Sequence, residues 1–227
     1  MSTLIRTSTS EGYTEALGRG VGRALRSGDV VRLVGDLGAG KTTLVRAVAA
    51  GLGVEPGMVS SPTYVIVNQY PTGSAAARER GIVEIVHADA YRLGSPEDLD
   101  SVGWDRLVEE RSLAARAGSV MLVEWPERIA GALPPPERCG VITIRAIDEH
   151  SRGLAIAMPE SWSARPEAAL LIEREPVRCP ITREWVEPTN PAYPFASERA
   201  KMADLGKWFG GGYRISRDAG PDELEGA

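Results

Sequence analysis

The chain has 227 residues, of which 43% are hydrophobic and 25% are charged, with a formal net charge of −5. This composition is typical of a globular protein with one well-buried domain and a smaller unit. No apolar run is long enough to span a membrane, and the first residues lack the apolar segment of a secretory signal, so we expect a cytoplasmic protein without membrane contact. The acidic balance, with a pI near 5.3, argues against direct contact with nucleic acid, which usually requires a basic stripe.

Three segments near the N-terminus predict a helix, a strand and a second helix. Residues 13–27 carry apolar residues at near-helical spacing, and residues 30–34 form a short apolar run suited to a buried strand. A glycine-rich loop follows at once, and residues 42–52 then predict a helix. Strand, loop and helix in this order form the context that a phosphate-binding loop requires.

The loop matches the pattern G-x-x-x-x-G-K-[ST] through Gly35, Gly40, Lys41 and Thr42. Its glycines let the backbone curl so that successive N–H groups point at phosphate oxygens, and the helix adds the positive end of its dipole. We expect Lys41 to reach the terminal phosphates of a nucleotide and the Thr42 hydroxyl to bind Mg²⁺. The residues expected to contact the nucleotide here are Gly35, Asp36, Leu37, Gly38, Ala39, Gly40, Lys41, Thr42 and Thr43.

Lysine usage supports this interpretation. Only three of the 26 basic residues are lysines, and Lys41 is the only lysine before residue 201. A GC-rich genome would explain why lysine is scarce, but not why the one early lysine lies in a glycine-rich loop. A compact ammonium enters a phosphate-binding loop as a point charge, whereas a planar guanidinium is too wide.

The middle of the chain predicts a hairpin and a further buried strand. Residues 64–70 and 82–86 are rich in β-branched and other strand-forming residues, and we expect them to pair around an exposed connection at 71–80. A helix is expected to start at 95–98, where proline takes the first helical position. Residues 120–123 predict the further strand.

Acidic residues follow two of these strands, Asp89 after residues 82–86 and Glu124 directly after residues 120–123. Both should emerge at the carboxyl edge of the sheet, where ligands bind in such folds. Glu124 is the better candidate for Mg²⁺, and Asp89 is a candidate to polarise the attacking water. For each, the alternative is a structural carboxylate that caps a nearby helix. Thr63 is either a switch residue that senses the γ-phosphate or a hydroxyl that caps a turn.

Three functions are compatible with these residues. The first is an ATPase, because the Asn-Lys-x-Asp element of many guanine-specific proteins is absent and this favours ATP over GTP. The second is a P-loop kinase for a small metabolite, with Arg78 and Arg80 in a lid over the phosphates. The third is a nucleotide-switched regulatory binding module whose C-terminal unit makes the contacts.

The end of the first domain is predicted from two closing strands. Three prolines at 134–136 break the chain, and residues 141–147 and 154–158 predict strands that are possible antiparallel partners. The predicted fold class is α/β, a P-loop NTPase-like central mixed sheet flanked by helices, over residues 1–160. Residues 161–175 have few strand signals and are interpreted as a linker with a helical turn.

Composition changes after residue 176. Both phenylalanines of the chain, Phe195 and Phe209, lie in this region together with two tryptophans and two tyrosines. We interpret residues 176–217 as a separate small unit. Residues 218–227 are acidic and are predicted to be a disordered tail.

Four motifs follow one another along the chain. They are Gly35-Asp36-Leu37-Gly38-Ala39-Gly40-Lys41-Thr42-Thr43, Ser61-Pro62-Thr63-Tyr64, His87-Ala88-Asp89-Ala90-Tyr91-Arg92-Leu93 and Val123-Glu124-Trp125-Pro126-Glu127. Together they closely resemble the TsaE family, bacterial ATPases that support threonylcarbamoylation of the adenosine beside the anticodon in transfer RNA. The resemblance covers about residues 5–158.

The resemblance implies roles for the motif residues. Thr42 and Glu124 would hold Mg²⁺, Lys41 the phosphates of ATP, and Asp89 the hydrolytic water, while Thr63 would be a switch. The family acts with TsaB-like and TsaD-like partners, and the TsaD-like protein carries the transfer chemistry. ATP hydrolysis would reset that complex, and transfer RNA would be met only through the partners.

The resemblance also implies that Trp125 lies near the nucleotide, with Tyr91 and Arg92 in the same wall. Two structural alternatives stay open at this point. Trp125 is then a core aromatic residue, and Arg92 is a surface residue in a salt bridge.

The C-terminal unit has a resemblance of its own. Its segments Cys179–Thr182, 194–201 and 204–208 are similar to the small zinc ribbons called DNA gyrase inhibitor YacG, which use four cysteines. Here Cys179 remains, whereas Thr182, Ala196 and Ala200 take the other three positions, so we predict no zinc. A unit this small rarely folds alone without a metal, so we expect its aromatic residues to pack on the ATPase domain or on a second chain. The lost ligands also argue against gyrase contact.

Overall fold

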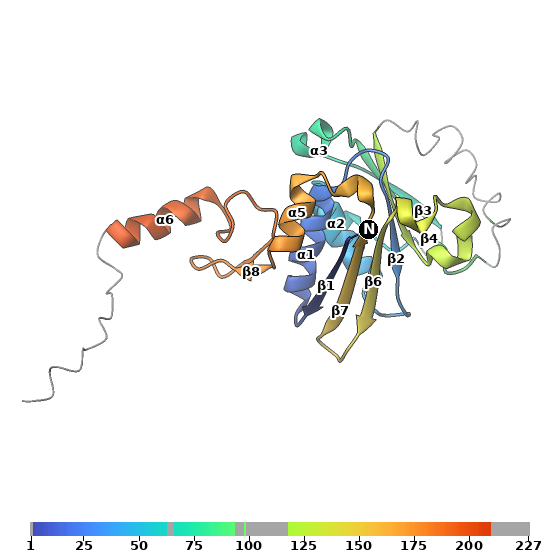
Figure 1. The fold of residues 1–227 in the computed structure, drawn as a ribbon, viewed down its shortest axis with the longest axis horizontal. Coiled ribbons are helices and arrows are strands. Elements are labelled where there is room, and N and C mark those ends of the chain that lie inside the picture. The colour runs from blue at the N-terminus through green and yellow to red at the C-terminus, as the bar shows by residue number, and fades with distance from the viewer. Residues whose placement is uncertain (1, 63–65, 94–97, 99–117, 210–227) are drawn as a thin grey trace, which may run out of the picture.

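A computed structural model describes residues 2–62, 66–93, 98 and 118–209 (Figure 1). In the described part, seven strands form one mixed sheet with the order β1-β7-β6-β2-β5-β4-β3. The strands of this sheet are β1 Ser2–Ser8, β2 Val30–Val34, β3 Val67–Pro71, β4 Glu84–Asp89, β5 Ser119–Glu124, β6 Gly140–Ala146 and β7 Arg152–Met158. The α-helices are α1 Glu11–Ala24, α2 Lys41–Gly51, α3 Ala75–Glu79, α5 Pro166–Glu173 and α6 Glu198–Phe209.

The sheet confirms the predicted mixed α/β fold. Four neighbouring strands, β4, β5, β2 and β6, run parallel. The hairpin of β3 and β4 and the closing pair of β6 and β7 are antiparallel, as expected from the sequence. The carboxyl ends of the parallel strands therefore meet at one edge, which is the edge that carries the glycine-rich loop.

Some strand boundaries differ from the predictions, and one strand was missed; β4, for example, is Glu84–Asp89 rather than 82–86. Strand β3 begins at Val67 rather than residue 64, because Ile66 has a positive φ of 68° and donates its N–H to Pro62 O. Strand β1 was not predicted; it lies at the sheet edge, antiparallel to β7, and Leu4 is its one buried hydrophobic residue. The helix start expected at 95–98 lies outside the described residues apart from Asp98, and so does the expected acidic tail at 218–227.

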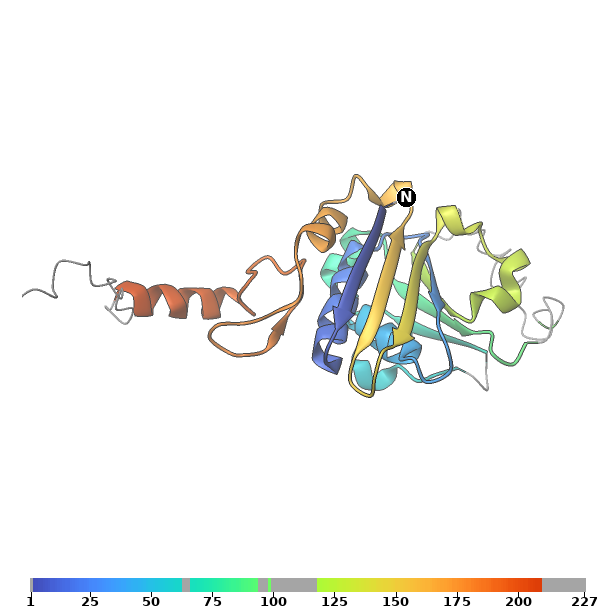
Figure 2. The same ribbon diagram turned by 60° about the horizontal axis from the view of Figure 1, so that its bottom comes forward.

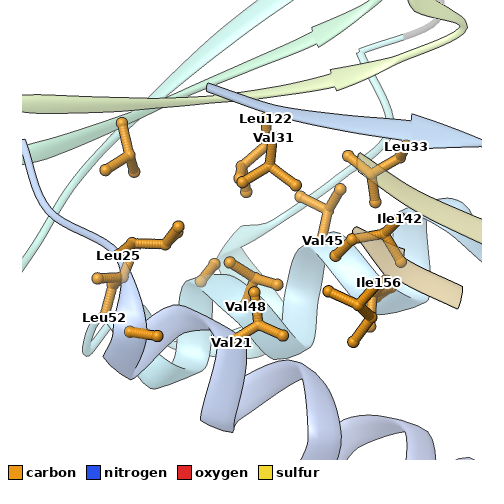
Figure 3. Close-up of a cluster of buried hydrophobic side chains, with 14 of the residues drawn as sticks. Val21, Leu25, Val31, Leu33, Val45, Val48, Leu52, Leu122, Ile142 and Ile156 are labelled. Atoms are coloured by element: carbon orange, nitrogen blue, oxygen red, sulfur yellow. The ribbon is translucent and has the colours of Figure 1, made fainter. Parts of the chain in front are cut away.

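Helices α1 and α2 cover one face of the sheet, and the main core lies between them and the strands (Figures 1 and 3). Figure 3 shows Val21 of α1 and Val45 and Val48 of α2 facing Val31 and Ile142 of the sheet. The helices approach each other closely because α1 carries glycines at the contact. A Cβ at Gly22 would overlap the carbonyl oxygen of Val48, and one at Gly18 would lie 2.5 Å from Ala47 Cβ.

The segment at 161–175, interpreted above as a linker, packs against the body of the protein. Trp162 is fully buried, and its indole N–H donates to Asp29 at 3.2 Å. Helix α5 contributes Ala168 and Leu171 to the main core. Sequence periodicity indicated only a helical turn here, because the segment is short and its buried residues have different partners: Trp162 lies against Gly140 of β6, and Leu171 against Gly20 of α1.

The C-terminal unit begins with the two-stranded hairpin of β8, Val177–Arg178, and β9, Trp185–Val186. Its aromatic residues pack in two ways, since Trp185 packs on the first domain whereas Tyr193 and Phe195 pack against the unit's own buried cluster. The Trp185 ring meets Tyr13 of α1 edge-on, at 5.5 Å between centroids, and Gly12 leaves no room for a side chain beneath it. Glu187 is buried and pairs with Arg19 and Arg23 of α1. Helix α6 then extends away from the body (Figures 1 and 2).

Within the described ranges, no helix combines the length and the apolar character needed to cross a membrane.

The contact between α1 and α2 generates a stability prediction. Alanine has the higher helix propensity, yet Gly22→Ala should destabilise the protein by about 1–3 kcal/mol, because its methyl group must displace the backbone of α2. Gly206→Ala in α6 is the matched control, since a Cβ there meets no atom within 4 Å, and it should stabilise by about 0.5–1 kcal/mol. Urea unfolding measures both values. Equal effects of the two substitutions would contradict the close contact.

Candidate functional site

The glycine-rich loop joins the end of β2 to the start of α2. Gly38 and Gly40 have φ values of 74° and 108°, and a Cβ on either would meet no atom within 4 Å, so the loop is open to a ligand. Gly35 has the opposite constraint, because a side chain there would overlap the carbonyl oxygen of Ile144. Helix α2 has no side-chain hydrogen bond at its N-cap. Its first N–H groups therefore remain available as donors for an anion.

Lys41 lies inside the loop and is 5% exposed. Its Nζ donates to the carbonyl oxygens of Gly35 at 2.7 Å and Asp36 at 2.9 Å, and it lies 4.0 Å from the centroid of the Trp125 ring. Burial lowers the pKa of this ammonium, while the carboxylates of Glu124 and Asp89 act in the opposite direction. The side chain of Lys41 is thus held inside the loop by two carbonyl oxygens and an aromatic ring.

The two acids predicted from the strand ends lie side by side. In the parallel register of β4 and β5, Asp89 is opposite Glu124. Both are buried, at 3% exposure each. The Thr42 hydroxyl donates to Glu124 Oε1 at 2.8 Å, which joins the start of α2 to the end of β5. The structure thus brings together the two residues that were predicted to bind Mg²⁺.

Asp89 is fixed by hydrogen bonds on both carboxylate oxygens. Oδ1 accepts from the backbone N–H of Tyr91 at 3.0 Å, and Oδ2 accepts from the Ser61 hydroxyl at 3.2 Å. The contact to Tyr91 stabilises the turn that follows β4, which is a structural role other than the helix cap named above as the alternative. The contact to Ser61 orients the carboxylate, which lines the cavity, so a role towards water stays a prediction.

The cavity beside the loop has a volume of about 320 Å³. Trp125 is half-buried, adopts a left-handed backbone conformation with φ 57°, and stacks at an angle on Tyr91 with 5.1 Å between ring centroids. It packs against the hydrophobic cluster on the second face of the sheet and also lines the cavity. The cavity residues are Leu37, Gly38, Gly40, Lys41, Thr42, Thr43, Ser61, Asp89, Tyr91, Glu124 and Trp125.

A second cavity of about 430 Å³ borders the same loop through Ala39, Gly40 and Thr43. Its polar lining comes from segments far apart in the sequence, including Ser10 before α1 and Arg152 at the start of β7. Arg152 Nε donates to Ala39 O at 3.1 Å. Sequence reasoning missed this cavity, because no local pattern links those segments to the loop.

His87 is a further residue that sequence reasoning did not single out. It lies on β4 two residues before Asp89, is fully buried, and places Nε2 3.0 Å from Glu124 Oε1. The sequence did contain a signal for His87. It precedes Asp89 by two residues, and residues two apart point to the same face of a strand.

Other expected residues lie elsewhere. Thr63 falls outside the described residues. Arg78 lies on α3, and Arg80 follows it and donates to the carbonyl oxygen of Arg23 at the end of α1. Ser27 N donates to Arg80 O, just before β2 begins. This is the amino edge of the sheet, opposite the glycine-rich loop, so the expectation of a lid formed by these two arginines is wrong.

A central parallel sheet, a glycine-rich loop at a helix N-terminus and acids at neighbouring strand ends define a P-loop NTPase-like α/β protein. The family model "Threonylcarbamoyl adenosine biosynthesis protein TsaE" matches residues 8–154. The chain therefore belongs to the TsaE family, and the resemblance described above is confirmed.

Curated relatives support the assignment. The tRNA threonylcarbamoyladenosine biosynthesis protein TsaE of Treponema pallidum is 34% identical over 150 residues, which cover 66% of this chain and 97% of that protein. The protein of the same name from Bacillus subtilis is 33% identical, covering 60% of this chain and 74% of its own. That from Streptomyces coelicolor is 41% identical, covering 49% and 66% respectively.

A solved structure supports the fold. The crystal structure of YdiB from Bacillus subtilis superposes with a TM-score of 0.51 at 24% identity, over 75% of this chain and 94% of that one. At this identity the likeness concerns the arrangement of the strands and helices.

The C-terminal unit matches the model "DNA gyrase inhibitor YacG" over residues 177–226. Where the resemblance places four metal ligands, Cys179 and Ala200 form a small buried cluster with Val186, and Ala196 packs against it. Burial by itself raises the pKa of the Cys179 thiol, but hydrogen bonds from Thr182 and from backbone N–H groups together lower that pKa to about 7. The thiolate is thus stabilised by amide hydrogens.

The Cys179 environment generates a titration prediction. The thiol should ionise near pH 7 in the folded protein, against an ordinary value of 9.0. Between these values the unfolded chain binds more protons, so this group should make stability rise with pH from 7 to 9. Thiolate ultraviolet absorbance measures the ionisation. Cys179→Ala is the control and leaves Cys139, whose pKa burial raises. An unchanged titration curve in that variant would refute the assignment.

Proposed function

We propose that the protein is the Mg²⁺-dependent ATP-hydrolysing component of the tRNA N6-threonylcarbamoyladenosine modification machinery. One observation carries the proposal, the 2.8 Å hydrogen bond from Thr42 to Glu124 beside an open glycine-rich loop. It brings together the hydroxyl at the start of α2 and the carboxylate at the end of β5, the two groups that P-loop ATPases use for magnesium.

The residues fit the proposed ligands. Mg²⁺ prefers oxygen donors, and the Thr42 hydroxyl and the Glu124 carboxylate supply two of them. The loop offers free N–H groups at the start of α2 and no side chain at Gly38 or Gly40 that would block a phosphate. When bound, Mg²⁺ would neutralise phosphate charge and polarise the terminal phosphoryl group.

The residues of the chain around the loop would each have a separate role. Lys41 would exchange its carbonyl partners on Gly35 and Asp36 for phosphate oxygens, a stronger charge-assisted interaction. Asp89 would orient the hydrolytic water, since Ser61 and the backbone of Tyr91 already fix its carboxylate. Trp125 would form a wall beside the phosphates. We assign the base and ribose to the second cavity, which borders the other side of the loop.

The cellular role rests on the family. The relatives are named for tRNA threonylcarbamoyladenosine biosynthesis, and we propose the same pathway here, with TsaB-like and TsaD-like proteins as partners and the cytoplasm as the location. Contact with tRNA through those partners agrees with the net charge of −5.

The kinase alternative is less well supported, because Arg78 and Arg80 are at the opposite edge of the sheet from the loop. The regulatory alternative has one supporting observation. The C-terminal unit packs on α1, and α1 packs on the phosphate-loop helix α2.

Substitution of the loop lysine tests the site. Lys41→Ala should lower ATP turnover at least about a hundredfold, because it removes a charge that stabilises the transition state. Glu124→Ala should do likewise and should weaken the dependence on magnesium. Steady-state phosphate release measures both. Arg78→Ala, at the far edge, is the control and should retain parental turnover. Parental turnover in Lys41→Ala would refute the assignment of the site.

Partner coupling separates the three functions. Phosphate release should rise when TsaB-like and TsaD-like proteins are added, and no added metabolite should become phosphorylated. A chain lacking residues 176–227 should still support tRNA modification in a strain without the gene, provided that its folding is verified by circular dichroism. Transfer of phosphate to a metabolite would favour the kinase. Loss of modification by the folded truncated chain would favour the regulatory module.

A further inference from the structure

His87 is a polar residue at a buried position of the sheet where an apolar side chain would pack equally well. It is 0% exposed, in the middle of β4, opposite Leu122 of β5 and Asn68 of β3. Within the described part of the chain, its Nδ1 has no hydrogen-bond partner. Burying such an atom costs free energy, so packing does not explain why the ring is there.

The other ring nitrogen makes a specific contact. Nε2 lies 3.0 Å from Oε1 of Glu124, the oxygen that also accepts from the Thr42 hydroxyl. Where Glu124 is ionised, its Oε1 can only accept, so Nε2–H is the donor of this contact, and Nδ1 has no partner among the described residues that would require a hydrogen there. The contact therefore fixes both the tautomer of His87 and the orientation of Glu124.

The consequence concerns the other oxygen of Glu124. Both hydrogen bonds described for this carboxylate go to Oε1, whereas Oε2 receives none from the described residues, and Glu124 lines the cavity beside the loop. A carboxylate with one bond, from Thr42, could rotate about that bond. A second donor on the neighbouring strand removes this freedom.

We propose that His87 is the positioning residue of the metal site: its Nε2–H holds Glu124 Oε1 and thereby fixes the orientation of the carboxylate that would hold magnesium. The inference rests on the proposed function, because it assigns Glu124 to Mg²⁺. Residues that orient a ligand in this way typically change metal affinity about ten- to a hundredfold when they are removed.

Two substitutions of similar polarity test the proposal. In His87→Gln the amide nitrogen lies near the place of Nε2 and can still donate to Glu124, whereas in His87→Asn it lies near the place of Nδ1 and falls short. Magnesium affinity is measured by titrating Mg²⁺ into the protein with bound fluorescent ADP. His87→Asn should bind Mg²⁺ about ten- to a hundredfold more weakly, and His87→Gln within about threefold of the parental protein.

A measurement without metal separates this proposal from the proposed function. ADP affinity in the presence of a chelator should be the same in both variants and in the parental protein, because His87 does not line the cavity. Ile85→Val, a small change two residues earlier on the same face of β4, is the packing control and should leave magnesium affinity unchanged. If the parental protein binds no nucleotide, the proposed function is wrong.

The outcomes are distinct. Equal magnesium affinity in His87→Asn and the parental protein would overturn the proposal. An equal loss of magnesium affinity in His87→Asn and His87→Gln would also overturn it, because it would indicate that the ring only fills space. A second readout needs no ligand, because the protein has only two histidines. Nitrogen NMR shifts should identify one of them as the Nε2–H tautomer, and this signal should move in Glu124→Gln; the opposite tautomer would also overturn the proposal.

Discussion

The parallel register between β4 and β5 is the constraint on which the site depends. It sets Asp89 opposite Glu124, and the alternation along both strands turns His87 and the two acids toward α2. Strand β2, on the other side of β5, delivers the glycine-rich loop at the same edge. A slip by one residue would send the acids to the second face, away from Thr42. Backbone pairing between the strands therefore determines where the side chains of the site lie.

Local pattern was sufficient for the parts of the site that are contiguous in sequence. The loop motif, the strands around it and the acids at Asp89 and Glu124 could all be predicted, because strand, turn and helix signals lie within a few residues of each other. The second cavity could not, since Ser10 and Arg152 meet only through the pairing of distant strands. Strand β1 was also missed. An edge strand with a single buried hydrophobic residue has a weak pattern, and it is stabilised by its partner β7.

Helix α1 connects the two parts of the chain. On one side its glycines let α2 approach to backbone contact, and on the other Gly12 and Tyr13 receive the Trp185 ring. Sequence composition placed a boundary near residue 176, where residue usage changes. Packing is continuous across it, because Trp162 and α5 already join the core and Glu187 pairs with arginines of α1.

The absence of a Cβ at residue 12 has a consequence for how such a chain can arise and change. Two family models match separate stretches, yet the first stretch has a recess shaped for an indole that belongs to the second. Any side chain at residue 12 would overlap the indole of Trp185. Residues 12 and 185 should therefore vary together across lineages, because a larger residue at one requires a smaller residue at the other.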